Sequence, residues 1–176
     1  MGLSRVIIVP HPDDEILFLY SYVKDRRKGD LYYSVTLPKG IRSHYWVRVF
    51  GGGTLGLEDK GKYVDGEYAG SDWIPNLEQG LEQLEKELSL DDNSEIIVPG
   101  TSYLYGHKHH VQLCDMMKKV FVEKDRIKWY LTETEQMDKE IMFLKEYPDQ
   151  KHILNQDDIR DYLDFGVEVA LVFGVK

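Results

Sequence analysis

Cysteine, net positive charge and long apolar runs are scarce or missing in this chain. Its 176 residues include one cysteine, Cys114, so an internal disulfide is excluded and a reducing, cytoplasmic compartment is expected. We expect Cys114 to be a small buried helix residue. Acidic residues outnumber basic ones by 31 to 22, and the resulting net charge of −9 argues against general binding to nucleic acid or anionic membranes. No apolar run approaches the roughly 20 residues of a membrane span, and no signal-peptide pattern begins the chain.

The composition that remains is typical of a globular protein, with 42% hydrophobic and 30% charged residues. Short apolar runs typical of buried strands alternate with segments of helical spacing. The predicted strands are Arg5–Val9, Leu31–Leu37, Glu95–Val98, Ile127–Leu131 and Val167–Phe173. The predicted helices are Asp14–Lys28, Asn76–Leu88, His110–Val122 and Glu135–Glu146. This alternation predicts an α/β fold with a largely parallel sheet flanked by helices, built as a single domain over residues 1–176.

The segment between Gly40 and Pro75 shows no sustained period. It contains a run of three glycines, Gly51–Gly53, and many aromatic residues. We expect an irregular segment here, which is either a binding loop or lid or a tolerated insertion.

One histidine and three acids are crowded into the stretch "IIVPHPDDEILF", Ile7 to Phe18, where a strand pattern gives way to a helical one. Acids in the first turn of a helix face the positive end of its dipole, each worth about 0.3–1 kcal/mol. Helix capping therefore explains Asp13, Asp14 and Glu15, but it does not explain His11.

A second cluster follows another predicted strand, in "EIIVPGTSYLYGHKHHVQL", Glu95 to Leu113. Four of the six histidines of the chain lie in these two stretches. Ligands of α/β sheets bind beyond the carboxyl ends of strands, so the two clusters predict one shared site. Two histidines and one carboxylate with open positions are typical of catalytic zinc, and also of a ferrous iron triad. A spare acid and a spare histidine beside such a metal supply a general base and an oxyanion stabiliser, the parts needed to hydrolyse an amide.

The two motifs resemble those of a known family. "VPHPDDE" resembles the [AP]-H-P-D-D-E signature of the PIG-L/LmbE-type zinc deacetylases, and "YGHKHHV", Tyr105 to Val111, is similar to their second motif, Y-G-H-P-D-H-V. A third stretch, Lys139 to Gln150, resembles the weaker K…Y-x-S-Q segment, with Asp149 where serine is usual. The resemblance implies a Rossmann-like fold and zinc-dependent removal of an N-acetyl group from an N-acetylglucosamine-type sugar or glycoconjugate, a small-molecule substrate.

Roles for individual residues follow from the same resemblance. It implies three ligands for zinc, or else ferrous iron: His11, Asp14 and His110. Asp13 would be the general base that activates the attacking water. His107 would polarise the acetyl carbonyl and protonate the leaving amine, and Tyr105 would help to stabilise the oxyanion. Glu15 would be a capping residue or would support the ligands from behind, pointing back towards the sheet.

The chain departs from the family pattern at two places. Lys108 and His109 replace the proline and aspartate of the second motif, and that aspartate supports the histidine at the position of His107. We therefore expect His107 to become charged only at lower pH, unless His109 points away from the site as a surface residue. The family also has an arginine and a glutamate for substrate contact, whereas this chain offers only Arg42 and Arg48 nearby. Three aromatic residues of that stretch could stack on a sugar or belong to the core: Tyr45, Trp46 and Phe50.

Two other functions are compatible with the motifs. A metal-dependent phosphoesterase would use similar residues, often with two metals about 3.5–4 Å apart. A non-catalytic binding domain on the same fold would hold a metal with four protein ligands and leave no open position.

Overall fold

The computed structural model describes residues 5–37, 41–58, 62–64, 67–69, 72–74, 76–100 and 107–176. The strands are β1 (Arg5–Val9), β2 (Leu31–Thr36), β3 (Gly53–Leu57), β4 (Lys62–Val64), β5 (Glu67–Ala69), β6 (Glu95–Pro99), β7 (Val122–Tyr130) and β8 (Val167–Gly174). The helices are α1 (Asp14–Lys24), α2 (Ile41–Phe50), α3 (Asn76–Leu88), α4 (Lys108–Val120), α5 (Glu133–Glu146) and α6 (Asp157–Phe165), with a 3₁₀ helix η2 (Pro148–Asn155).

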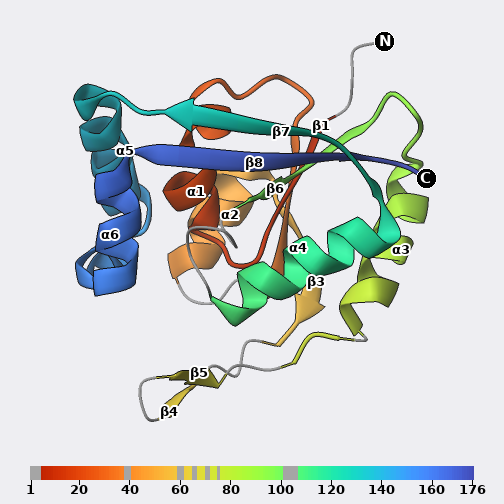
Figure 1. Cartoon of the computed structure of the whole chain (residues 1–176), viewed down its shortest axis with the longest axis horizontal. Coiled ribbons are helices and arrows are strands. Elements are labelled where there is room, and N and C mark those ends of the chain that lie inside the picture. The colour runs from red at the N-terminus through yellow and green to blue at the C-terminus, as the bar shows by residue number, and fades with distance from the viewer. Residues whose placement is uncertain are drawn as a thin grey trace.

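Six strands form one mixed sheet in the order β3-β2-β1-β6-β8-β7, and β4 and β5 form a separate two-stranded hairpin. The pairings β2–β3, β1–β2 and β1–β6 are parallel, whereas β8 runs antiparallel to both of its neighbours. Figure 1 shows the long β7 and β8 strands lying side by side across the molecule. The α/β fold with a mostly parallel sheet is thus confirmed.

Helices cover both faces of the sheet, which is why its central strands read as continuous apolar runs. On one face, Ile7 and Val9 of β1 join a core built with α1, α2, α5 and α6. On the other face, Val6 and Ile8 join a core built with α3 and α4. The two helical layers are visible on either side of the strands in Figure 1.

The expectation of an irregular segment from Gly40 to Pro75 is wrong for the described part of that segment, which contains α2, β3, β4 and β5. Tyr45, Trp46 and Phe50 are core residues of α2, each at most 6% exposed, and are not positioned to stack on a ligand. The glycines of this segment interrupt the sequence pattern, but at two positions the packing of the folded chain requires a residue without a side chain. A Cβ atom at Gly52 would overlap the Trp46 ring, and one at Gly53 would overlap the ring of Tyr33.

Several predicted boundaries also shift. The first helix ends at Lys24 instead of Lys28, and the predicted helix His110–Val122 runs from Lys108 to Val120. The strand predicted at Ile127–Leu131 begins earlier, at Val122, because it pairs along its length with β8. Helix α6 was not predicted. None of the helices in the described ranges is both long and apolar enough to cross a membrane.

Candidate active site

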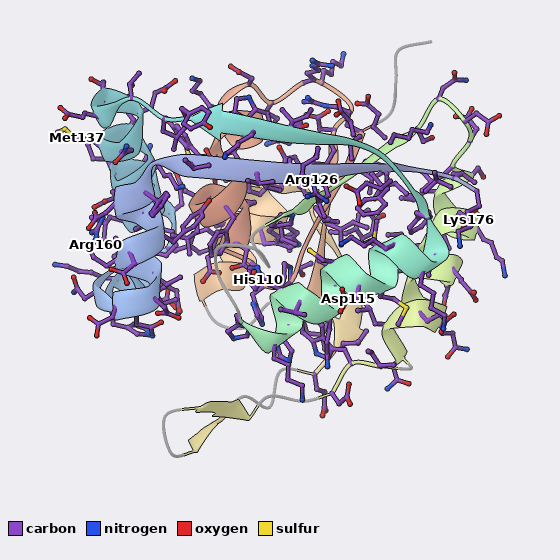
Figure 2. The ribbon with its side chains drawn as sticks, in the orientation of Figure 1. His110, Asp115, Arg126, Met137, Arg160 and Lys176 are labelled. Carbon is purple, nitrogen blue, oxygen red and sulfur yellow. The ribbon has the colours of Figure 1, made fainter. Side chains whose placement is uncertain are left out.

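The two sequence clusters meet around the carboxylate of Asp14. β1 and β6 are parallel neighbours, so the segments that follow their carboxyl ends lie at the same edge of the sheet. Oδ2 of Asp14, in the first turn of α1, lies 3.1 Å from Nδ1 of His11 and 3.3 Å from Nε2 of His110. Figure 2 shows His110 in the first turn of α4, near the segment between β1 and α1. The three residues predicted as metal ligands are therefore adjacent.

The donor set suits a divalent metal. One ligand atom from each of the three residues lies within 4.8 Å of the others. Zinc–nitrogen and zinc–oxygen bonds of about 2.0–2.2 Å give a tetrahedron whose edges are roughly 3.3–3.5 Å long, close to the two distances measured from Asp14. The side chains of His11, Asp14 and His110 are 12%, 6% and 1% exposed, so the site is shielded but reachable from the His11 side.

Asp14 is ionised, as a metal ligand must be. Burial on its own would raise the pKa of this carboxyl group, but the neighbouring His110 and His11 outweigh burial and hold the pKa well below its usual range. The backbone N–H of His11 also donates to Oδ2, at 2.8 Å. The carboxylate is thus held in place by the backbone and by both imidazole rings.

His107 lies beside these residues as the N-cap of α4. Its ring is 5.4 Å from that of His11 and 5.6 Å from that of His110, measured between centroids. Burial, followed by the neighbouring His110 and His11, lowers the pKa of His107 to about 3. Its Nδ1 atom accepts a hydrogen bond from the backbone N–H of His109 at 3.2 Å, so the proton of the neutral ring is on Nε2. Burial is the largest cause of this lowering, whereas the expectation from the sequence rests on the missing aspartate.

The sequence predicts either that His107 loses the support of an aspartate at position 109 or that His109 points outward as a surface residue. The second alternative is wrong. The side chain is fully buried, and its Nδ1 atom lies 3.0 Å from Nε2 of His11. Its ring stacks on Trp73 with 3.7 Å between centroids and 14° between planes. A metal-bound histidine usually shares its second ring nitrogen with a hydrogen-bond partner, and His109 occupies that position for His11.

The remaining acids of the first motif are also buried. Asp13 is 3% exposed and is the N-cap of α1, without a side-chain hydrogen bond to the helix. Glu15 is fully buried and bonds to Tyr147 of a distant segment, so it is neither a surface cap nor a metal ligand in the described cluster. Burial raises the pKa of Glu15 to about 7, while its hydrogen bonds from Tyr147 and Asp13 act in the opposite direction.

Some predicted residues lie outside the described part of the chain. Tyr105 is one of them, and the side chains of Arg42 and Arg48 are likewise not described. Two residues that border the site had no predicted role. Trp73 lies in the segment without a sustained period, so no pattern indicates its role. Tyr147 matches the tyrosine of the third stretch that resembles the family, and this match could have indicated it.

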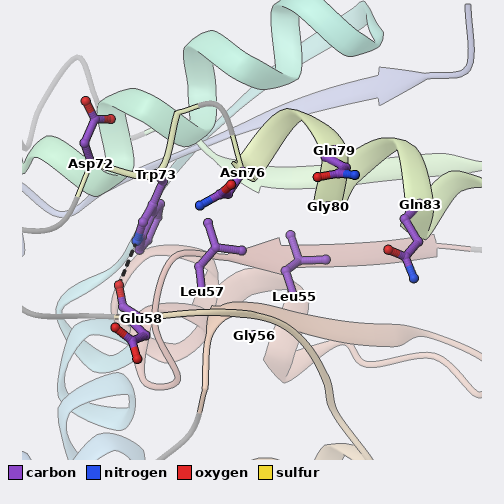
Figure 3. A pocket seen from close by; sticks show the side chains of 10 residues that line it. All are labelled: Leu55, Gly56, Leu57, Glu58, Asp72, Trp73, Asn76, Gln79, Gly80 and Gln83. Atoms are coloured by element: carbon purple, nitrogen blue, oxygen red, sulfur yellow. Dashed lines mark hydrogen bonds between the residues drawn. The ribbon is translucent and has the colours of Figure 1, made fainter.

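A groove of about 620 Å³ lies next to Trp73, between α3 and β3. Figure 3 shows Leu55 and Leu57 of β3 on one side of it and Asn76, Gln79 and Gln83 of α3 on the other. Two acids, Glu58 and Asp72, lie at the Trp73 end, and the indole N–H of Trp73 donates to the Glu58 carbonyl at 3.3 Å. The described lining includes no lysine or arginine, so it favours uncharged or positively charged hydrogen-bonding groups.

No protein-family model and no curated protein matches the sequence. The fold does match a solved structure. That structure is the crystal structure of the zinc-inhibited form of teicoplanin deacetylase Orf2, with a TM-score of 0.55 and 13% sequence identity over 98% of each chain. At this identity the likeness establishes the α/β fold and leaves the activity to be argued from the site.

Proposed function

We propose that this protein is a zinc-dependent N-deacetylase that acts on an N-acetylated sugar or glycoconjugate of the N-acetylglucosamine type, with ferrous iron as the other candidate metal. The observation that carries the proposal is the convergence of His11, Asp14 and His110 on one point at the carboxyl edge of the sheet. The similar fold of a teicoplanin deacetylase, and the resemblance of both motifs to a deacetylase family, support the same reaction class.

Each side chain has a distinct task in this proposal. His11, Asp14 and His110 would hold a divalent ion, which polarises the acetyl carbonyl and lowers the pKa of water to about 7. Asp13 would take a proton from the water that attacks the carbonyl carbon. The same carboxyl group would then return this proton to the nitrogen as the C–N bond breaks, giving acetate and a free amine.

We assign His107 the role of a neutral hydrogen-bond donor and not that of a general acid. Because its pKa is about 3, the ring is neutral near pH 7, with its proton on Nε2. A neutral ring can donate a hydrogen bond to the carbonyl oxygen as negative charge develops there. It would not also protonate the leaving amine, because it would then become an anion. We assign that proton to Asp13 and keep Tyr105 as a proposed second donor to the oxygen.

The groove beside Trp73 supports a substrate larger than an acetyl group. Its amide side chains and its two acids suit the hydroxyl groups of an uncharged sugar or conjugate better than a phosphate. We propose that this surface receives the part of the substrate that is not hydrolysed.

A substrate panel tests the proposal. The zinc-loaded protein is incubated with free N-acetylglucosamine, its uncharged glycosides, N-acetylated thiol conjugates and phosphate esters, and acetate and phosphate are measured. We expect acetate from at least one N-acetylated compound and no phosphate. Release of phosphate alone would favour the phosphoesterase, and four protein ligands around the bound metal, with neither product, would favour a binding domain.

A further inference from the structure

The backbone of Asp13 has an unusual conformation. Its φ of 117° and ψ of −27° lie in a region that glycine adopts readily and other residues do not. In the described part of the chain, Ser89 is the one other non-glycine residue with positive φ. Such a conformation persists where surrounding contacts hold it, and it often marks a functional position.

Glu15 holds this backbone from the first turn of α1. Its Oε2 atom accepts the backbone N–H of Asp13 at 2.9 Å. The carboxylate is fully buried, and a buried carboxylate is costly unless its oxygens receive hydrogen bonds. The bond to Asp13 satisfies one of the two oxygens and fixes the peptide unit that leads into Asp13.

Tyr147 satisfies the other oxygen from a distant part of the chain. Its hydroxyl group donates to Oε1 of Glu15 at 2.5 Å, across 132 residues of sequence. Tyr147 is fully buried where α5 passes into η2, and its ring packs on those of Tyr45 and Phe143. The tyrosine is thus fixed by the core, and it fixes Glu15 in turn.

We propose that Tyr147 and Glu15 are positioning residues that hold Asp13 in the orientation it needs as the general base. Tyr147 orients Glu15 through one carboxylate oxygen, and Glu15 clamps the Asp13 backbone through the other. The role as base rests on the proposed function, whereas the clamp itself does not. A structural purpose alone does not require this arrangement, since an apolar pair of similar volume would usually be at least as stable in a core.

The test compares Tyr147→Phe with Tyr45→Phe. Both substitutions remove one buried phenol hydroxyl from the same aromatic cluster, and Tyr147 is the one that donates to Glu15. In the zinc-loaded proteins, hydrogen exchange of the Asp13 amide is followed by NMR. We expect exchange at Asp13 at least about tenfold faster in Tyr147→Phe than in Tyr45→Phe, after correction for global stability. Equal exchange in the two variants would overturn the clamp.

The same variants are assayed on the best N-acetylated substrate of the panel. We expect Tyr147→Phe to lower kcat about 10–100-fold, with unchanged KM and zinc content, and Tyr45→Phe to have little effect. Glu15→Gln keeps an oxygen for the Asp13 amide, so it should retain more of kcat than Glu15→Leu at equal zinc occupancy. Equal kcat in Tyr147→Phe and Tyr45→Phe would overturn the positioning role. If the wild type is inactive on every substrate, the proposed function fails, and amide exchange still decides whether the clamp exists.

Discussion

The Nε2 atom of His11 lies 3.0 Å from the Nδ1 atom of His109, so a histidine supports a predicted metal ligand where the family motif has an aspartate. Trp73 stacks on the other ring and fixes its plane. This contact turns the Nδ1 atom of His11 towards Asp14. The departure at His109 therefore concerns His11, the predicted metal ligand, in addition to the effect expected on His107.

The His109 contact predicts a loss of metal affinity when its acceptor is removed. His109→Phe keeps an aromatic ring against Trp73 but offers no acceptor to His11. Loss of such a partner typically lowers metal affinity by about 10–100-fold, which a competition titration with a chelating dye would measure. His109→Asn is the matched control, because its side-chain oxygen can replace Nδ1 and should restore most of the affinity. Wild-type affinity in His109→Phe would show that the contact serves packing alone.

The strained backbone at Asp13 predicts that replacing this residue by glycine stabilises the folded protein. A residue in such a conformation costs about 1–3 kcal/mol, and glycine avoids most of that cost while losing about 0.4–1 kcal/mol through the entropy of the unfolded chain. We expect metal-free Asp13→Gly to be more stable than Asp13→Asn by about 1 kcal/mol in urea unfolding. The asparagine variant removes the charge and keeps the strain, so it isolates the backbone effect. Equal or lower stability of the glycine variant would contradict strain at this position.

The residues predicted as metal ligands could be proposed from the sequence because the motif that contains each of them follows a short, strongly apolar strand. The runs ending at Val9 and Val98 read plainly as strands, and parallel neighbours bring their carboxyl ends together. The His-x-x-Asp spacing then predicts that His11 and Asp14 approach each other around a single turn. The α/β fold follows from the same alternation of patterns.

Contacts between distant segments explain most of what sequence analysis missed. β3 has two glycines in five residues and forms as an edge strand because it pairs with β2. The link between Glu15 and Tyr147, like the stacking of Trp73 on His109, depends on tertiary packing that no local pattern encodes. Helix α6 is different, because Ile159, Tyr162 and Leu163 are buried at helical spacing. That pattern was readable, although it covers only two turns.

The buried ion pair between Arg5 and Asp30 predicts a dependence of stability on pH. Their side chains are 5% and 3% exposed, and Nε of Arg5 donates to Oδ1 of Asp30 at 2.8 Å. Burial would raise the pKa of Asp30, but the hydrogen bond from Arg5 and that from the Arg27 backbone outweigh it, so the pKa is lowered in the folded state. The pair therefore stabilises the protein above the unfolded-state pKa of about 3.9, and this contribution is lost as pH falls through the lower folded-state pKa.

Asp30→Asn tests this linkage. At pH 7 it leaves Arg5 buried without its charge partner, which should lower the free energy of unfolding by about 3–5 kcal/mol. Below pH 4 the stability of the variant should fall less steeply than that of the wild type. Glu123→Gln, which breaks an exposed pair with Arg126, is the control and should have a much smaller effect. Parallel pH profiles for the wild type and Asp30→Asn would exclude Asp30 as a source of the acid sensitivity.

The central claim is that Asp13 acts as a base beside a metal held by His11, Asp14 and His110. The most direct measurement is the rate of acetate release from the best N-acetylated substrate by zinc-loaded wild type and Asp13→Asn, with metal content determined in both. We predict that the wild type releases acetate and that this release stops when zinc is chelated. Asp13→Asn should retain its zinc but release acetate about 10²–10⁴-fold more slowly. Equal rates in the two proteins, or no acetate from a fully zinc-loaded wild type, would contradict the claim.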